Sequence, residues 1–128
     1  MPCINEIIER VGRVRPDALD DGTKSGWLIE LDGKLYRDVI LKHVPLSGEV
    51  MPVPPRSFPE DAAKPLIVPV PFDILYDLYL MSQIDFCNRE MDNYNNSALA
   101  FNTALDDYKR DYHRTHLPIQ TGGFQNLF

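Results

Sequence analysis

The chain has 128 residues, of which 44% are hydrophobic and 25% charged, a balance typical of one soluble folded domain and not of a disordered chain. Thirteen Lys and Arg against 19 Asp and Glu give a formal net charge of −6, and residues 71–114 alone carry four basic and eight acidic side chains. An acidic protein gains nothing from the counterion release that drives binding to a phosphate backbone. We therefore do not expect a primary DNA or RNA binder.

The first two segments place apolar residues at helical spacing. Residues 3–14 predict an amphipathic helix that ends before Pro16, because proline disfavours helical geometry at the residue before it. A second helix is predicted over residues 21–42, in which Gly26 and Gly33 lower the helix propensity and either could mark a close helix contact. Three residues at its start could accept hydrogen bonds from the free N–H groups: Asp20, Asp21 and Thr23. Its expected buried stripe is Trp27, Leu28, Leu31, Leu35 and Val39.

Residues 44–70 are too rich in proline to form a helix, because proline lacks the N–H group that a helix interior needs. Residues 50–53 and 66–70 could form short extended pieces, with an edge pairing between them. A long irregular segment in a small domain is often functional. Two interpretations stay open, an arm packed loosely over the helices and a contact arm for a neighbouring subunit.

A third helix is predicted over residues 71–91, with Pro71 in the first turn, where the missing N–H is harmless. It is apolar on most of its circumference, so we expect it at the centre of the bundle or partly covered by another subunit. Residues 92–97 are rich in Asp, Asn and Ser and predict a break. A fourth helix is predicted over residues 96–114, with the stripe Ala98, Phe101, Leu105, Tyr108 and Tyr112.

The start of the chain has no basic stretch, and no window approaches the roughly 18 consecutive apolar residues of a membrane span, so neither a secretory signal nor a span is expected. Two cysteines are too few for a disulfide framework. We expect Cys3 and Cys87 to be free thiols in a reducing cytoplasm, with Cys87 buried as a small apolar residue.

The sequence contains no recognisable catalytic motif. The glycines at 122–123 are not followed by the Lys and Ser or Thr of a phosphate-binding loop. His113 and His116, with Asp107 and Asp111 nearby, have a spacing that can bring zinc ligands to one helix face. His116 lies at the expected helix end, however, so we expect these groups to satisfy the last helix carbonyls and not to hold a metal.

Two groups of acidic residues are interpreted as solvated surface. The first does not repeat the spacing of a metal loop, and consists of Asp85, Glu90 and Asp92. The second alternates with Lys and Arg, so near-neighbour ion pairs are expected, and consists of Asp106, Asp107 and Asp111.

Helix-packing and capping residues form a familiar pattern in several segments, namely 27–33, 68–73, 75–81, 84–85, 94–98, 101–102 and 112–116. This pattern resembles small proteins encoded in the head-morphogenesis region of tailed-phage genomes and of prophages in Gram-positive bacteria, the head–tail connector (adaptor, head-completion) proteins. The resemblance implies a short helical domain that assembles as a ring under the portal and joins the DNA-filled head to the tail. It carries no catalytic signature.

Residues and resemblance together predict an all-α fold, a four-helix bundle-like domain of two antiparallel pairs over residues 1–118. The proline-rich arm at 44–70 joins the second and third helices, and residues 119–128 form a flexible tail. The expected function is structural and not enzymatic, with no cofactor, metal, specific nucleic acid or membrane. The candidate contact residues are Tyr76, Tyr79, Met81, Val50, Val53 and Phe58.

The resemblance further implies the partners and the location of the protein. It would form a homo-oligomer, in the virion a ring, that contacts the portal and tail-completion proteins after synthesis in the bacterial host cytoplasm. Two alternatives stay open. One is another phage head or DNA-packaging accessory protein, and the other is a helical adaptor domain that binds a peptide in a groove.

Overall fold

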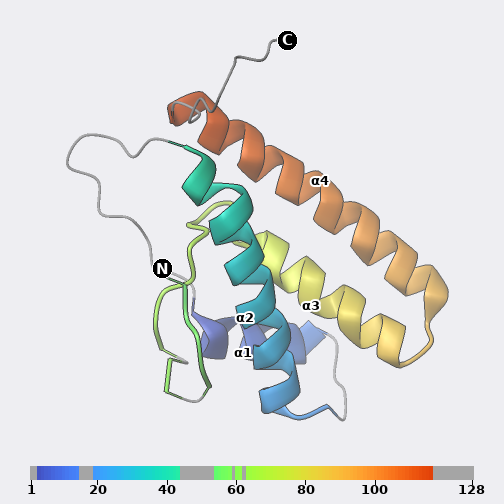
Figure 1. Cartoon of the computed structure of the whole chain (residues 1–128). Helices are drawn as coiled ribbons and strands as arrows, with labels where there is room; N and C mark the ends of the chain where they lie inside the picture. Colours follow the sequence, from blue (N-terminus) through green and yellow to red (C-terminus); the bar gives the residue numbers. More distant parts are fainter. Residues whose placement is uncertain (1–2, 15–18, 44–53, 59, 62, 117–128) are drawn as a thin grey trace.

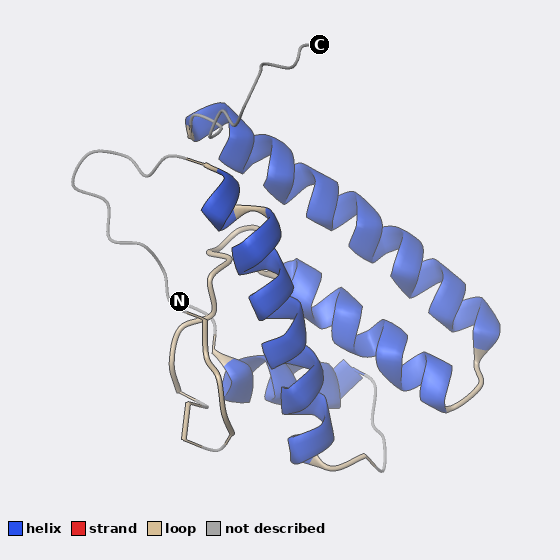
Figure 2. Cartoon of the chain, in the orientation of Figure 1, coloured by secondary structure: helices blue, strands red, loops and turns tan. Residues whose placement is uncertain are grey.

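The computed structural model is mostly helical and has no strand among the residues it describes, which are 3–14, 19–43, 54–58, 60–61 and 63–116 (Figure 1, Figure 2). These residues form four α-helices and one short 3₁₀ helix: α1 (Ile4–Val14), α2 (Asp21–Asp38), η1 (Ile40–Lys42), α3 (Ile74–Cys87) and α4 (Met91–Thr115). The predicted all-α character is confirmed. The expectations for Pro16, Val50, Val53 and the tail at 119–128 concern positions outside the described residues.

Helix α3 lies at the centre of the fold, in contact with α1, α2 and α4. After a tight turn at Asn88–Glu90, α4 runs back along α3 as its long neighbour (Figure 1). Helices α1 and α2 contact each other as well as α3. This central position explains why α3 is apolar around most of its circumference.

The core is formed largely by the expected apolar stripes, although Trp27 of the predicted second-helix stripe is only partly buried. Helix α2 begins at the predicted cap, where the carboxylate of Asp20 accepts a hydrogen bond of 2.8 Å from the N–H of Thr23. The buried apolar residues of the first three helical elements are Ile4, Ile7, Ile8, Val11, Leu28, Leu31, Leu35 and Ile40. The predicted stripe of α4 faces α3 with Tyr108 and Tyr112 buried and Phe101 and Leu105 partly buried.

Part of the proline-rich segment also belongs to the core. Leu66, Ile67 and Val68 are all buried, and Pro65 forms an isolated antiparallel bridge with Cys3. These described residues therefore do not fit the interpretation of an arm packed loosely over the helices.

Several helix ends differ from the prediction, and α3 ends at Cys87, four residues before the expected end at 91. Helix α2 ends at Asp38, four residues early, and the chain continues as the 3₁₀ turn η1. Helix α3 begins at Ile74 and not at Pro71, because residues 71–73 form a turn whose carbonyls bond three residues ahead, as in the 3.2 Å bond from Leu75 N–H to Phe72 O.

The break predicted at residues 92–97 is wrong, because α4 runs through that stretch. The chain instead turns at Asn88–Glu90, where Arg89 takes the left-handed conformation with φ of 59°. The polar side chains of 92–97 are accommodated within the helix. Asn93 donates to the carboxylate of Glu90 at 3.0 Å, and Ser97 donates to Asp85 at 3.3 Å.

The structure also bears on three smaller expectations. A Cβ added at Gly26 or Gly33 would meet no atom within 4 Å, so neither glycine marks a close helix contact. Both cysteines are free thiols, but Cys87 is exposed and not buried. Within the described part of the chain, none of the helices has the length and apolarity needed to cross a bilayer.

Candidate functional site

The predicted contact residues occupy different environments. Tyr76 is fully buried in the core, so its side chain is not available to a neighbouring subunit in this fold. Tyr79 and Met81 are partly buried on α3, and the ring of Tyr79 packs against that of Phe101 with centroids 5.2 Å apart. Phe58 is partly buried against the core. Among the described candidates, Tyr76 is therefore fully buried, whereas Tyr79, Met81 and Phe58 keep part of their surface exposed.

Tyr76 belongs to a buried polar network, which we call the Asp32–Tyr76 junction and define by Asp32, Ile67, Val68 and Tyr76. The hydroxyl of Tyr76 donates to Asp32 Oδ1 at 2.5 Å and accepts from the Val68 N–H at 2.9 Å. Asp32 Oδ2 accepts from the Ile67 N–H at 3.2 Å. The junction joins α2, α3 and the returning proline-rich segment, and it satisfies two backbone N–H groups that no helix or sheet serves.

Burial changes the acidity of both side chains in the junction. Burial raises the pKa of Asp32 from 3.8 to about 6, although the bonds from Tyr76 and Ile67 partly counteract this. Burial and the neighbouring carboxylate also raise the pKa of Tyr76 well above its usual value. Because Asp32 is enclosed by the core, we assign the junction a structural role.

A second polar contact crosses from α1 to α3. Arg10 donates from Nε and Nη2 to the two oxygens of Asp77 at 2.9 and 2.6 Å, and from Nη1 to Asp73 at 3.3 Å. The hydrogen bonds to Asp77 and the charges of both carboxylates raise the pKa of Arg10, against an opposing effect of burial. The side chains of Asp73 and Asp77 are only 11% and 18% exposed. This bidentate contact holds α1 on the start of α3.

The acidic groups expected on the surface divide into two kinds. Asp85 is buried between α3 and α4, where it accepts from Ser97, so the interpretation as solvated surface is wrong for this residue. Glu90 and Asp92 are exposed as expected. On α4, near-neighbour pairs form between Arg110 and Asp107 at 3.5 Å and between Arg114 and Asp111 at 2.9 Å, as predicted.

His113 of α4 and His116, which caps the end of this helix, have separate surroundings. His116 is buried and stacked on Tyr112, with centroids 3.9 Å apart, and its Nδ1 lies 3.3 Å from the Tyr112 carbonyl, which agrees with the predicted use of the last helix carbonyls. His113 turns instead toward His43, which follows η1. Their ring nitrogens Nδ1 and Nε2 are 3.3 Å apart.

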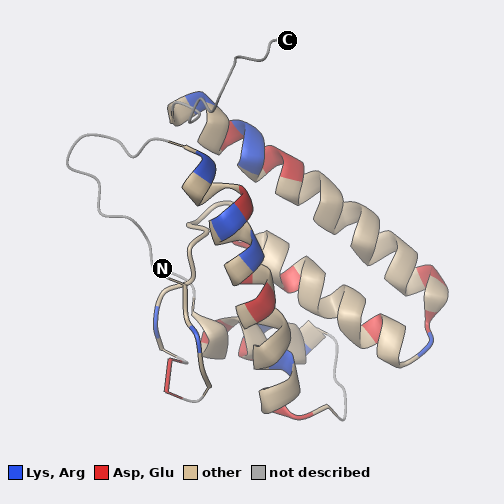
Figure 3. Cartoon of the chain, viewed as in Figure 1, with Lys and Arg blue, Asp and Glu red and all other residues tan. Residues whose placement is uncertain are grey.

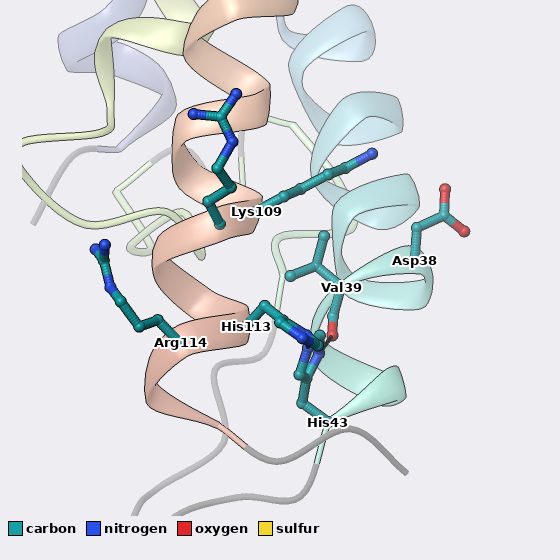
Figure 4. Close-up of a pocket in the computed structure, with 7 residues that line it drawn as sticks. Asp38, Val39, His43, Lys109, His113 and Arg114 are labelled. Carbon is teal, nitrogen blue, oxygen red and sulfur yellow. Dashed lines mark hydrogen bonds between the residues drawn. The ribbon is translucent and has the colours of Figure 1, made fainter. Parts of the chain in front are cut away.

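His43 and His113 lie in an open groove of about 590 Å³ between the end of α2 and the C-terminal part of α4 (Figure 4). We call it the histidine groove and define it by its lining, Asp38, Val39, His43, Lys109, Arg110, His113 and Arg114. Figure 3 shows basic and acidic residues side by side at this end of α2 and α4. The lining thus combines one aliphatic side chain, Val39, with two imidazoles and four charged side chains.

Large apolar side chains are exposed where α3 turns into α4. Phe86 is 55% exposed and Met91 is 44% exposed. The Phe86 ring packs on Tyr94 of the following helix, with centroids 5.3 Å apart. We call Phe86, Met91 and Tyr94 the hairpin tip. Exposed apolar groups with charged neighbours such as Arg89 are typical of protein contact surfaces.

Sequence reasoning missed the junction and the histidine pair for different reasons. Asp32 lies between Leu28 and Leu35 on the apolar face of α2, and a carboxylate at such a position is a sign of a buried partner. His43 and His113 are 70 residues apart, so no local spacing could join them. The ligand pair considered from the sequence, His113 and His116, is not brought together.

No protein-family model, no curated protein and no solved structure matches the chain, so comparison with known proteins does not assign it to a family.

Proposed function

We propose that the chain is a structural virion-assembly protein, a head–tail connector of a tailed phage or prophage that joins the portal of the head to the tail. The proposal is supported by the sequence resemblance and by the compatible all-α character of the described residues. In this proposal several copies form a ring, with each four-helix domain as a subunit and the proline-rich arm at 44–70 as a contact element.

The observation that carries the proposal is the hairpin tip. Phe86 and Met91 are large apolar side chains that stay exposed, and the ring of Tyr94 packs against that of Phe86. Exposed aromatic and Met side chains are enriched in contacts between proteins. We assign the hairpin tip to the contact with the next copy of the chain. Tyr79, Met81 and Phe58 are secondary candidates.

The test is assembly with the portal protein encoded in the same phage or prophage genome. The two proteins are co-expressed, and their complex is measured by light scattering and viewed by electron microscopy. We expect ring-shaped assemblies that contain both proteins. A chain that stays monomeric and binds neither portal nor tail-completion protein would contradict the proposal.

A matched pair of variants locates the contact. Phe86→Asp places a charge at the hairpin tip, and Val14→Asp places one at the end of α1, where Val14 is 69% exposed. We expect Phe86→Asp to abolish assembly while circular dichroism stays unchanged, and Val14→Asp to assemble normally. Equal behaviour of the two variants would exclude the hairpin tip as the contact. Binding of a host protein without any effect on particles would favour the adaptor alternative.

A further inference from the structure

We propose that His43 and His113 form a pH-sensitive clasp, which joins the end of α2 to the end of α4 and opens when both imidazole rings are positively charged. The proposal is independent of virion assembly. It rests on the hydrogen bonds of the two rings, on the packing of α4, and on the charges that line the histidine groove.

The hydrogen bonds of His43 determine which ring nitrogens carry protons. Its Nδ1 lies 2.6 Å from the carbonyl oxygen of Val39. A carbonyl only accepts hydrogen bonds, so this Nδ1 carries a proton, and Nε2 of the neutral ring keeps its lone pair. His43 Nε2 lies 3.3 Å from His113 Nδ1. While His43 is neutral, the donor of the hydrogen bond between the rings is therefore His113 Nδ1.

This hydrogen bond tolerates one added proton but not two. When either ring alone is charged, one of the two facing nitrogens still carries a hydrogen and the other a lone pair. When both rings are charged, both facing nitrogens are donors, and the two like charges repel each other. Histidine is the side chain that ordinarily changes its charge between about pH 5 and 8. Acidification across this range therefore replaces a hydrogen bond with a repulsion.

The charged groups around the pair do little to offset a second positive charge. Among the described residues that line the groove, the one carboxylate is that of Asp38, which already pairs with Arg37 at 3.2 Å. The lining also contains three cationic side chains of α4, those of Lys109, Arg110 and Arg114. Two of these, Arg110 and Arg114, each pair with an aspartate of α4. The surroundings therefore favour separation of the two charged rings.

The clasp joins two elements that do not otherwise lie against each other. Among the described helices, α4 packs directly on α3 and makes no backbone contact with α2 or η1. His43 directly follows η1, and its ring reaches both His113 and Tyr112 of α4, the latter at a centroid distance of 5.0 Å. Figure 4 shows both imidazole rings pointing toward each other, with the side chain of Arg114 extended away from them. Protonation of the two rings therefore acts on the link between the ends of α2 and α4.

The first test records the nitrogen chemical shifts of the histidine rings in the wild-type chain between pH 8 and pH 5. At pH 8, neutral His43 and neutral His113 should both carry their proton on Nδ1. At pH 5 both rings should be charged, and the nuclear Overhauser contact between them should be lost. A proton on Nε2 of neutral His43, or a contact that persists between two charged rings, would overturn the proposal.

The second test measures the opening by hydrogen exchange of the His43 amide, which donates to the Ile40 carbonyl at 3.3 Å. The exchange rate is divided by that of an unstructured peptide at the same pH, which removes the intrinsic effect of pH. Because one hydrogen bond is lost, we expect the protection of this amide to fall about tenfold from pH 8 to pH 5. The Asn88 amide, which donates to Ile84 at the far end of α3, should keep its protection. An equal fall at both amides would indicate general acid unfolding and contradict a local clasp.

A matched pair of variants assigns the effect to this pair of rings. His113→Asn places an uncharged amide near the position of Nδ1, and this amide can donate to neutral His43 or, after rotation, accept from charged His43. The protection of the His43 amide should then be the same at pH 8 and pH 5. His116→Gln removes the histidine stacked on Tyr112 and should show the same fall as the wild type. A fall that survives in His113→Asn, or that disappears in His116→Gln, would overturn the proposal.

Discussion

The Asp32–Tyr76 junction and the histidine groove both place polar side chains between helices, but they differ in access to water. Asp32 and Tyr76 are fully enclosed, and their hydrogen bonds are made to each other and to backbone N–H groups. His43 and His113 meet at the edge of an open groove. Enclosed polar groups stabilise one arrangement of the chain, whereas polar groups that water can reach remain available to a ligand.

The largest expected effect tests the enclosed region. Tyr76→Phe removes the donor to Asp32 and the acceptor for the Val68 N–H, which leaves two buried groups short of a partner. We expect a loss of about 3 kcal/mol in the free energy of unfolding, measured by urea denaturation. The half-buried Tyr79 offers a matched control, and Tyr79→Phe should cost less than about 1 kcal/mol. Equal losses for the two variants would show that the hydrogen bonds of the Tyr76 hydroxyl contribute no more to stability than the hydroxyl of the half-buried Tyr79.

The pH dependence of the free energy of unfolding should come in part from the buried carboxyl of Asp32. Its pKa is about 6 in the folded chain and 3.8 ordinarily, so the folded state binds this proton more tightly. The contribution of Asp32 is therefore fully present below about pH 4 and is lost as the pH rises through 6, by about 3 kcal/mol in total.

Asp32→Asn removes this titration and is the variant that isolates it. We expect the difference in unfolding free energy between wild type and Asp32→Asn to change between about pH 4 and pH 7, with the wild type losing stability relative to the variant. Urea denaturation at a series of pH values measures this difference. Parallel pH profiles for the two proteins would contradict a raised pKa at Asp32.

The contact of Arg10 with Asp73 and Asp77 is less enclosed than the Asp32–Tyr76 junction and less exposed than the histidine groove. Arg10→Ala would leave two largely buried carboxylates without their cation, and we expect a loss of about 1–2 kcal/mol. Arg13 forms an exposed pair with Glu9 one turn along the same helix, and Arg13→Ala should cost less than about 0.5 kcal/mol. Thermal unfolding of the two variants measures the contrast. A larger loss for Arg13→Ala would refute this ranking.

The smallest expected effect is a gain. Gly33 follows Asp32 directly but faces solvent, and a Cβ there would meet no atom within 4 Å. Gly33→Ala should therefore stabilise the chain by about 0.5–1 kcal/mol through helix propensity alone. A loss of stability, seen as a lower Tm, would mean that the face of α2 around Gly33 is packed against another part of the protein and does not face solvent.

The sequence was sufficient to predict the elements that depend on local pattern. The apolar periodicity around Ile7, Leu31 and Tyr108 identified three core faces, and Asp20 was among the predicted caps. Features set by tertiary contacts were missed. The stretch at 92–97 resembles a break because Asn and Ser favour turns, yet Ser97 instead bonds Asp85 across two helices. The histidine pair depends on residues 70 positions apart, which no window of sequence can join.

The burial of Leu66–Val68 suggests that the fold does not depend on an unbroken backbone before this segment. Arg56 is exposed and precedes this buried stretch in the sequence. The stretch itself is anchored to α2, because the Ile67 N–H donates to the carboxylate of Asp32. Cutting the backbone after Arg56 would divide the protein into two fragments, one with α1 and α2 and the other with α3 and α4. The shared core would keep these fragments together, so the molecule should behave as a split protein whose halves reassemble without a peptide link.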